Sequence, residues 1–336
     1  MKILFSSYAF HPSVGGIETV SRILAEQFAL AGHEVELITE TPGPEIAGAN
    51  YRVTRNPSFA RLLRLLRWCD VVFQNNVSLR SLVPARLLGK RTIVVHQTWI
   101  RRASGKIGWR DRIKYALLPG VTNVAISRAV AELLGVPASI IGNPYDENIF
   151  RPRANTTRDK TLVFLGRLVS DKGVDLLLEA LKLLRADGLT PALTIIGRGP
   201  EDANLRRFAT EAALDSQIEF VGEKSGAALA EILNRHRILV VPSRWPEPFG
   251  IVALEGIACG CVVVGSSQGG LSEAIGPCGI TFENGDCPSL AAALKRLLGD
   301  SALEESLRRA GPAHLRHFET SAVTRAYLQL IKEVVR

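Results

Sequence analysis

The sequence lacks the features that mark membrane-spanning, disulfide-linked and metal-binding proteins. No uncharged apolar run reaches the ~18 residues of a membrane-spanning helix, so none is expected. The five cysteines include no Cys-x-x-Cys pair, which favours reduced, buried thiols in a cytoplasmic protein. Neither an Asp-x-Asp motif nor a His/Cys set with ligand spacing occurs, so no metal site is expected. The apolar start, Met1–Phe5, is too short for a signal peptide and predicts a first strand.

What the sequence does contain is the composition of a soluble globular protein with unevenly placed charge. Of its 336 residues, 46% are apolar and 22% are charged, and the length suits two domains. The net charge of +8 is concentrated in residues 52–114, which hold 15 basic and 2 acidic residues. A basic segment of this size predicts an anionic partner, either a nucleic acid, an anionic lipid surface or an anionic substrate.

Short apolar runs alternate with amphipathic stretches along the whole chain. This alternation predicts an α/β protein with parallel sheets that helices cover on both faces. A polar stretch with prolines at 143–155 indicates a joint between two Rossmann-like doubly wound domains that face each other across a cleft. We expect domains at 1–150 and 151–320, and a C-terminal helix at 321–336 that packs back toward the N-terminal domain. The predicted strands are 3–7, 34–39, 71–74, 92–96, 121–126, 161–165, 193–196, 218–221, 238–241, 262–265 and 280–282.

Two carboxylates, Glu247 and Glu255, follow the predicted strand at 238–241 with seven residues between them. Pro248 suits the first turn of a helix, and Gly260 suits its end. Glu247 would then lie just before a helix N-terminus, where free N–H groups and the helix dipole favour phosphate or sugar oxygens. The alternative is that both acids are ordinary solvated side chains.

Three positions in the first half are candidate ligand contacts. Gly15-Gly16 precedes a predicted helix and would let the backbone approach a ligand closely, although a plain tight turn is the alternative. His96 ends a strand and would face the cleft, unless it is a buried structural histidine. Glu40 stands where a dinucleotide fold keeps its ribose acid, but the missing Gly-x-Gly-x-x-Gly argues against NAD binding.

Basic and glycine-rich loops recur in the second half. Arg167 and Lys172 precede a helix predicted at 175–184, where a guanidinium fork and a lysine charge suit a diphosphate. The turns Gly197–Gly199 and Gly269-Gly270 follow two further strands. Each feature alone is explained by a plain turn or a solvated cation. Several such loops at one sheet edge indicate a ligand that lies along that edge.

With these motifs together, the chain resembles the family-4 glycosyltransferases, retaining enzymes of GT-B fold, over nearly its whole length. The resemblance rests on an ordered set of motifs and on no single one of them. The set is Gly15-Gly16-x-Glu18, Asn143-Pro144, Gly166-Arg167, Lys172-Gly173, Gly197-x-Gly199, Glu247 with Glu255, and Gly269-Gly270-x-x-Glu273. The resemblance implies that the second domain binds a nucleotide-diphosphate sugar, such as a UDP- or GDP-sugar, without metal or cofactor. It implies that the first domain binds the acceptor.

The resemblance also implies roles for single residues. Glu247 would hold hydroxyls of the donor sugar, and Glu255 would hold the nucleotide ribose. Arg167 and Lys172 would neutralise the departing diphosphate, and His96 would contact the sugar. The remaining implied contacts are Gly15, Gly16, Gly197 and the amides of Phe249, Gly250 and Ile251. No enzyme nucleophile is evident, and the route that the resemblance implies is same-face attack assisted by the leaving phosphate.

The expected function is therefore a hexosyltransferase-type transfer to an acceptor hydroxyl, in envelope polysaccharide, lipopolysaccharide or glycolipid synthesis. Arginines alternate with leucines at 61–67, and basic with aromatic residues at 99–115. These stretches predict peripheral attachment to the inner membrane face and a sugar or lipid-linked acceptor, unless the leucines are core and the arginines solvated. No recognised nucleic-acid-binding fold accompanies the charge. Two alternatives stay open, a GT-B sugar-nucleotide epimerase and a non-catalytic basic protein that binds lipid or nucleic acid.

Overall fold

The computed structural model divides the chain into two compact units. It describes residues 1–13, 15–46, 48–100, 107–154 and 156–336. Unit 1 consists of 1–144 and 319–336, and unit 2 consists of 145–318. The division after residue 144 lies six residues before the boundary expected from the sequence, and Tyr145 is the first residue of unit 2. Its backbone N–H donates to the carbonyl of Phe318, 3.2 Å away, where the chain leaves that unit.

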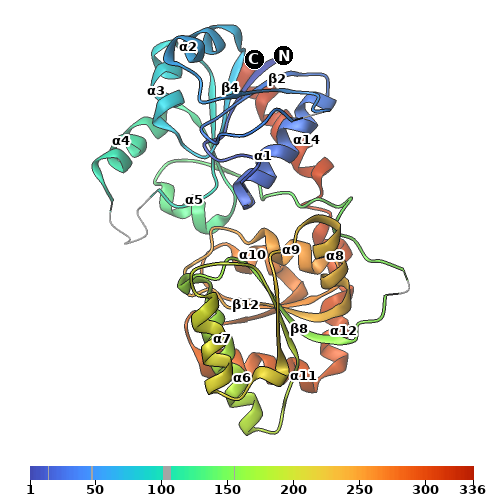
Figure 1. Cartoon of the computed structure of the whole chain (residues 1–336). Helices are drawn as coiled ribbons and strands as arrows, with labels where there is room; N and C mark the ends of the chain where they lie inside the picture. The colour runs from blue at the N-terminus through green and yellow to red at the C-terminus, as the bar shows by residue number, and fades with distance from the viewer. Residues whose placement is uncertain (14, 47, 101–106, 155) are drawn as a thin grey trace. The chain divides into compact units, whose positions relative to one another are not determined.

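Unit 1 contains a seven-stranded parallel sheet with the order β3-β2-β1-β4-β5-β6-β7 (Figure 1). Its strands are β1 (Lys2–Ser6), β2 (Glu34–Thr39), β3 (Arg52–Arg55), β4 (Val71–Asn75), β5 (Thr92–His96), β6 (Thr122–Ala125) and β7 (Ser139–Ile140). The two outermost strands, β3 and β7, were not predicted. They are partly or fully exposed at the sheet edges, so they carry no apolar run that the sequence could reveal.

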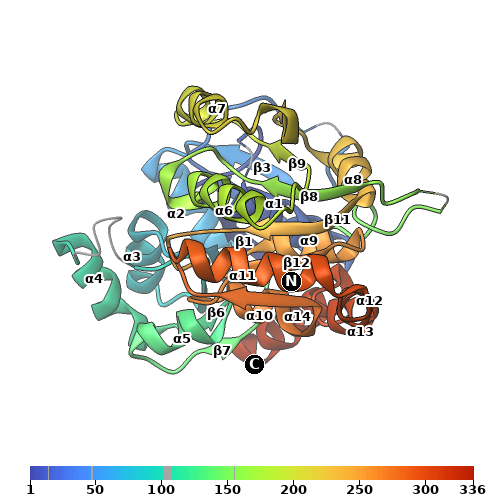
Figure 2. The same cartoon turned by 90° about the horizontal axis from the view of Figure 1, so that it is seen from below.

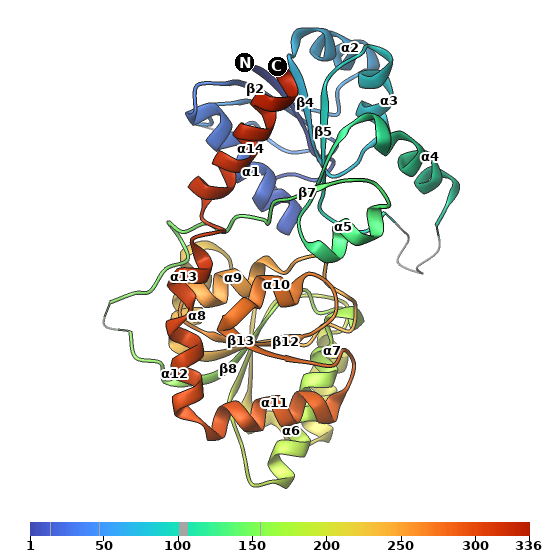
Figure 3. The ribbon, with the colours of Figure 1, turned by 180° about the vertical axis from the view of Figure 1, so that it is seen from behind.

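Helices cover both faces of this sheet. They are α1 (Gly16–Leu30), α2 (Phe59–Trp68), α3 (Leu79–Leu87), α4 (Trp109–Leu117), α5 (Arg128–Leu134) and α14 (Thr320–Val335), with a 3₁₀ turn at Leu118–Gly120. The C-terminal helix α14 lies beside α1 (Figure 3). Its Tyr327 is fully buried and packs edge-on against Phe73 of β4, with ring centroids 5.3 Å apart. On the other face, the leucines of α2 pack into a cluster with Leu4 and Val72.

Unit 2 contains a six-stranded parallel sheet with the order β10-β9-β8-β11-β12-β13. Its strands are β8 (Lys160–Leu165), β9 (Leu193–Ile196), β10 (Ile218–Gly222), β11 (His236–Val241), β12 (Val262–Ser266) and β13 (Gly279–Phe282). Counted within the unit, this is the doubly wound order in which the first and fourth strands lie side by side. Ligands of such sheets bind at the carboxyl ends of the strands, near that switch in strand order.

The helices of unit 2 lie on both faces of its sheet (Figures 1 and 2). They are α6 (Val174–Ala186), α7 (Asp202–Glu211), α8 (Gly226–Arg235), α9 (Ile251–Ala258), α10 (Leu271–Ile275), α11 (Cys287–Gly299), α12 (Ser301–Arg309) and α13 (Gly311–Leu315), with 3₁₀ turns at Ser170–Lys172, Asp215–Gln217 and Gly276–Cys278. Helices α6 and α11 pack on one face over a core that includes Phe164 and Val240. Helix α9 packs on the other face, where Gly256 faces Leu239.

Candidate functional site

The loops that follow β8 and β11 lie against each other at the carboxyl edge of the unit 2 sheet. The N–H of Arg244 donates to the carbonyl of Asp171 over 2.9 Å. Gly173 has a positive φ of 66°, and a Cβ on it would lie 2.0 Å from the carbonyl oxygen of Pro242. Only glycine fits this approach, because any side chain would force the two loops apart. The contact brings Lys172 to the start of the Glu247 segment.

Glu247 is the centre of a small polar cluster in this loop contact. Its Oε1 accepts from the Lys172 ammonium at 2.5 Å and from the Ser243 hydroxyl at 2.6 Å. The Glu247 side chain is 13% exposed and that of Lys172 is 26% exposed. The N–H of Gly270, in the loop after β12, donates to the Glu247 carbonyl over 2.7 Å. Glu247 is therefore fixed through both its backbone and its side chain at the carboxyl edge of the sheet.

Helix α9 begins at Ile251, three residues later than Pro248 had suggested. The reason is Gly250, whose φ of 109° is outside the helical region and which packs against Leu271. The first turn of α9 carries no acid and no side-chain cap. The ring of Phe249 is buried against Phe318, so only the backbone of this residue is left to meet a ligand.

Glu255 lies one turn into α9 and is partly exposed. Burial raises the pKa of its carboxyl to about 8, and the negative charge of Asp146 adds to the rise. In the described part of the chain, no group hydrogen-bonds to this carboxyl. Below about pH 8 Glu255 is therefore a neutral acid that both donates and accepts, which suits contact with a diol.

Arg167 and Gly197 lie in the loops after β8 and β9. Arg167 is exposed, and its guanidinium has no hydrogen bond or ion pair among the described residues. Gly197 has a φ of 146°, and a Cβ there would lie 1.8 Å from the carbonyl oxygen of Gly166. The N–H of Leu168 donates to the carbonyl of Arg198 over 2.9 Å. The two loops therefore run side by side, with a free guanidinium at their surface.

Gly15 and Gly16 lie at the start of α1 in unit 1. The backbone of Gly15 is extended, a conformation that any residue adopts. A Cβ added at Gly15 would lie 2.6 Å from Oε2 of Glu18, which is the movable end of a side chain. Packing within unit 1 therefore does not require glycine at position 15. A close approach by a ligand remains the explanation that the sequence suggested.

His96 is fully buried at the end of β5. Its Nε2 lies 3.0 Å from Oδ1 of Asn123, and its Nδ1 has no partner. Burial lowers the pKa of the imidazole to about 4, so the ring is neutral near pH 7. The ring has no exposed surface, so a sugar could reach it only if this enclosure opened. The structural alternative weighed for His96 fits these contacts, and the sugar contact stays a prediction.

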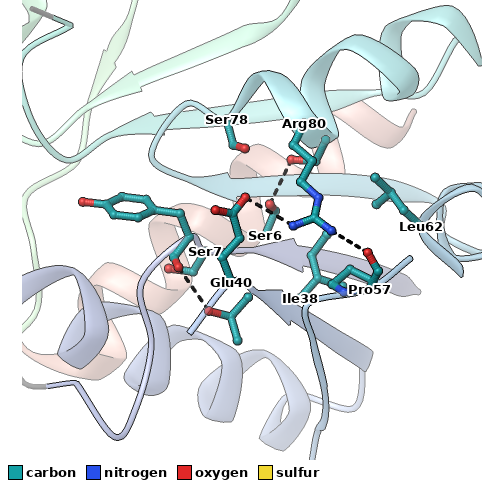
Figure 4. A pocket seen from close by; sticks show the side chains of 11 residues that line it. Ser6, Ser7, Ile38, Glu40, Pro57, Leu62, Ser78 and Arg80 are labelled. Atoms are coloured by element: carbon teal, nitrogen blue, oxygen red, sulfur yellow. Dashed lines mark hydrogen bonds and ion pairs between the residues drawn. The ribbon is translucent and has the colours of Figure 1, made fainter. Parts of the chain in front are cut away.

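Unit 1 has a polar pocket at the ends of β1 and β2 (Figure 4). Arg80 of α3 lies over it, with its guanidinium 3.5 Å from the Glu40 carboxylate and 2.5 Å from the carbonyl of Pro57. The hydroxyl of Ser6 lies 2.9 Å from that of Ser81 at the base. Glu40 is thus paired with an arginine, and the pocket combines an acid, a guanidinium and hydroxyls.

The basic segment 52–114 separates into two kinds of surface. In α2, Leu62, Leu65 and Leu66 are buried, whereas Arg64 and Arg67 are exposed to solvent. In α4 no residue is buried, and Trp109 is 64% exposed. Arg101, Arg102 and Lys106, which belong to the basic and aromatic stretch, lie outside the described residues.

The described residues contain neither a candidate metal site nor a helix suited to span a membrane. No group of three or more His, Cys, Asp or Glu side chains there is placed to hold a metal ion. Among the helices of the same residues, none combines the length and the apolar character needed to cross a bilayer.

Two residues were not singled out from the sequence. They are Ser243 of this cluster and Asn284, whose amide nitrogen donates to the Ser243 carbonyl over 3.2 Å. Each stands two positions after the end of a strand, β11 and β13 respectively. Position shortly after a strand is the signal that could have found them, because polar side chains there reach the ligand edge of the sheet.

Comparison with known proteins gives a consistent result. The model of the family "Glycosyl transferases group 1" matches residues 146–314. "Glycogen synthase" of Mycobacterium tuberculosis is 30% identical over 232 residues, which is 67% of this chain and 53% of that protein. The "Phosphatidylinositol N-acetylglucosaminyltransferase gpi3 subunit" of Schizosaccharomyces pombe is 23% identical, over 87% of this chain and 71% of that one. The matched region spans about half the length of the glycogen synthase.

Solved structures match over almost the whole chain. Sucrose-phosphate synthase of Thermosynechococcus elongatus superposes with a TM-score of 0.82 and 21% identity, over 99% of this chain and 98% of that one. Alr3699/HepE of Anabaena, in a complex with UDP and glucose, gives 0.81 and 17% over 99% and 100%. At identities of 21% and 17%, the structural similarity shows the fold alone.

Proposed function

This chain belongs to the group 1 glycosyl transferases, and from that premise we propose that it transfers a sugar from a nucleotide-diphosphate sugar to an acceptor hydroxyl. The family and the GT-B fold predicted from the sequence are confirmed by the family match and by the solved structures. The observation that carries the proposed activity is the Glu247 cluster at the start of α9. It lies inside the matched region, at the sheet edge where doubly wound folds bind ligands.

The proposed donor site assigns each part of the substrate to groups of matching chemistry. The free oxygen of Glu247 accepts from hydroxyls of the sugar, while Lys172 and the unpaired Arg167 lie in the loop that meets the diphosphate. The first-turn N–H groups of α9 add a positive dipole end. Glu255 holds the ribose diol.

The proposed reaction retains the configuration at the anomeric carbon. The bond from that carbon to the diphosphate oxygen breaks, and the acceptor oxygen bonds to the same face. The acceptor proton passes to the leaving phosphate oxygen. The residues of this chain contribute by aligning the hydroxyl and by stabilising the negative charge of the leaving group, and the proposal requires no metal or cofactor. Isolation of a covalent sugar–enzyme adduct would overturn this route.

We assign acceptor binding to unit 1. The pocket of Figure 4 offers a carboxylate and a guanidinium close together, which matches neighbouring hydroxyls of a sugar or other polyol. Gly15-Gly16 is the other proposed acceptor-side group, and His96 stays the proposed sugar contact. One relative, of Corynebacterium glutamicum, is named "GDP-mannose-dependent monoacylated alpha-(1-6)-phosphatidylinositol monomannoside mannosyltransferase". A lipid-linked acceptor in glycolipid or envelope glycan synthesis is the corresponding proposal here.

We further propose that α4 attaches the protein to the cytoplasmic face of an anionic membrane. Trp109 and Ile113 are 64% and 39% exposed, and Arg110, Arg112 and Lys114 alternate with them. Flotation with phosphatidylglycerol vesicles tests this. Trp109→Ala should reduce the bound fraction severalfold, whereas Phe59→Ala, at an equally exposed aromatic on α2, should not. Equal binding to neutral vesicles would remove the membrane proposal.

Release of nucleoside diphosphate, measured with and without acceptor, tests the activity itself. Glu247→Ala and Lys172→Ala should each reduce release by about 10²–10³-fold, because each removes a contact to developing charge or to the sugar. Glu223→Ala, at an exposed acid of the same unit, is the matched control. Turnover of donor without acceptor would favour the epimerase, and no donor binding would favour the non-catalytic alternative.

A further inference from the structure

We propose that Ser243 and Asn284 are positioning residues that orient the Glu247 carboxylate toward the donor sugar. Neither touches the reacting atoms in this proposal, and both act through Glu247. The inference rests on the proposed function, because it concerns how the same donor site is built.

The two carboxylate oxygens of Glu247 differ in their hydrogen-bond partners. Oε1 accepts two hydrogen bonds, from Ser243 at 2.6 Å and from Lys172 at 2.5 Å. Oε2 has no partner among the residues that the structure describes. One oxygen is thus anchored and the other is free to accept from a sugar hydroxyl. Ser243 is 1% exposed, so its hydroxyl is enclosed by protein while it donates to Glu247.

Ser243 is itself held by Asn284. The amide nitrogen of Asn284 donates to the backbone carbonyl of Ser243 over 3.2 Å. The amide oxygen of the same side chain accepts from the N–H of Gln268 over 2.8 Å. Asn284 therefore joins the loops after β11, β12 and β13 through one side chain. The N–H of Ser267, which donates to the Phe282 carbonyl over 2.8 Å, closes the same junction.

Glu247 needs this support to be placed precisely. A glutamate side chain has several rotatable bonds, and a loop position does not restrict them, so precise placement needs neighbours that are fixed themselves. Lys172 is a poor sole anchor, because a bound diphosphate would compete for its ammonium. The Ser243 hydroxyl carries no charge and meets no such competition. It keeps Glu247 oriented when a bound diphosphate also attracts the Lys172 ammonium.

The test compares the affinities for a sugar nucleotide and for its nucleoside diphosphate. We would measure both by calorimetry with UDP-glucose and UDP, and with GDP-mannose and GDP, and use the pair that the unsubstituted protein binds. Ser243→Ala should weaken the sugar nucleotide about tenfold, and Asn284→Ala about threefold, with the nucleoside diphosphate unchanged for both. The double variant should be no weaker than Ser243→Ala, because the two residues act in series.

Two further variants make the outcomes decisive. Asn204→Ala, at an exposed asparagine on α7, should change neither affinity. Glu247→Ala should weaken the sugar nucleotide alone, and if it does not, or if neither pair binds, the proposed function fails. If Glu247→Ala behaves as expected but the Ser243 and Asn284 variants weaken both ligands equally, or additively, the positioning role is refuted. Should Ser243→Ala fail to fold, the partly exposed Asn284 carries the same test.

Discussion

Glu255 gives the sharpest prediction, because its carboxyl is protonated in the native protein and ionised in the unfolded chain over a wide pH range. Burial raises its pKa from 4.5 to about 8. Between these values the native protein keeps a proton that the unfolded chain has lost. The free energy of unfolding must therefore fall as pH rises through this window and level off above it. Glu255→Gln removes the titration and keeps the shape, so the variant should lack this fall.

The magnitude follows from the size of the pKa rise. A shift from 4.5 to about 8 corresponds to an upper value of about 5 kcal/mol. Glu255 keeps some contact with solvent, so we expect roughly half of that. The variant and the unsubstituted protein should be equally stable near pH 4.5, and the variant should be ~2–3 kcal/mol more stable at pH 8. Urea unfolding from pH 4.5 to 9 measures this, with exposed Glu223→Gln as the control.

Parallel stability curves for the two proteins would refute the argument, since they would mean that Glu255 has the same pKa in the folded and unfolded states.

Nucleotide binding offers a second readout of Glu255 ionisation. With a pKa of about 8, roughly a tenth of the carboxyls are ionised at pH 7. Because the neutral carboxyl is the form that suits the ribose diol, affinity for a nucleoside diphosphate should fall about tenfold from pH 7 to 9, and Glu255→Gln should abolish the fall. An equal fall in the variant would assign the pH dependence to another group.

Three further predictions concern packing, charge and the acceptor. Gly173→Ala should lower the free energy of unfolding, measured in urea, by ~2–4 kcal/mol and abolish donor binding, because its Cβ would lie 2.0 Å from the Pro242 carbonyl oxygen. The control is Gly135→Ala, which has the same φ of 66° but open space around it, and it should lower the free energy of unfolding by only ~1–2 kcal/mol. Glu304→Ala should cost ~1–3 kcal/mol by calorimetry, because the buried carboxylate accepts from the guanidiniums of Arg237 and Arg308, which would lose this partner, and an unchanged melting temperature would contradict this. Arg80→Ala should raise the KM for acceptor and leave the KM for donor unchanged in steady-state assays, whereas a change in the donor KM would remove the acceptor assignment.

The inner strands were predictable because they are buried on both faces and read as short apolar runs. Strand β9, at 193–196, was predicted with its observed bounds, and four buried residues show why. The two edge strands of unit 1, β3 and β7, escaped prediction for the opposite reason, whereas the edge strands of unit 2, β10 and β13, were predicted. Strand β3 reads Arg-Val-Thr-Arg and has no fully buried residue, so no pattern of the side chains distinguishes it from a loop. What makes it a strand is its pairing with β2, a contact between residues that are distant in sequence.

The same limit applies to the site. Lys172 and Glu247 were assigned to different parts of the donor because each was interpreted in its own loop. The structure joins them within 2.5 Å, through a glycine contact at position 173 that no local pattern reveals. This pairing has a chemical consequence. A cation that already contacts the sugar-holding carboxylate also stands next to the place where negative charge would develop on the diphosphate. Lys172 would then link the two ends of the breaking bond, so its loss should impair sugar placement and departure of the leaving group together.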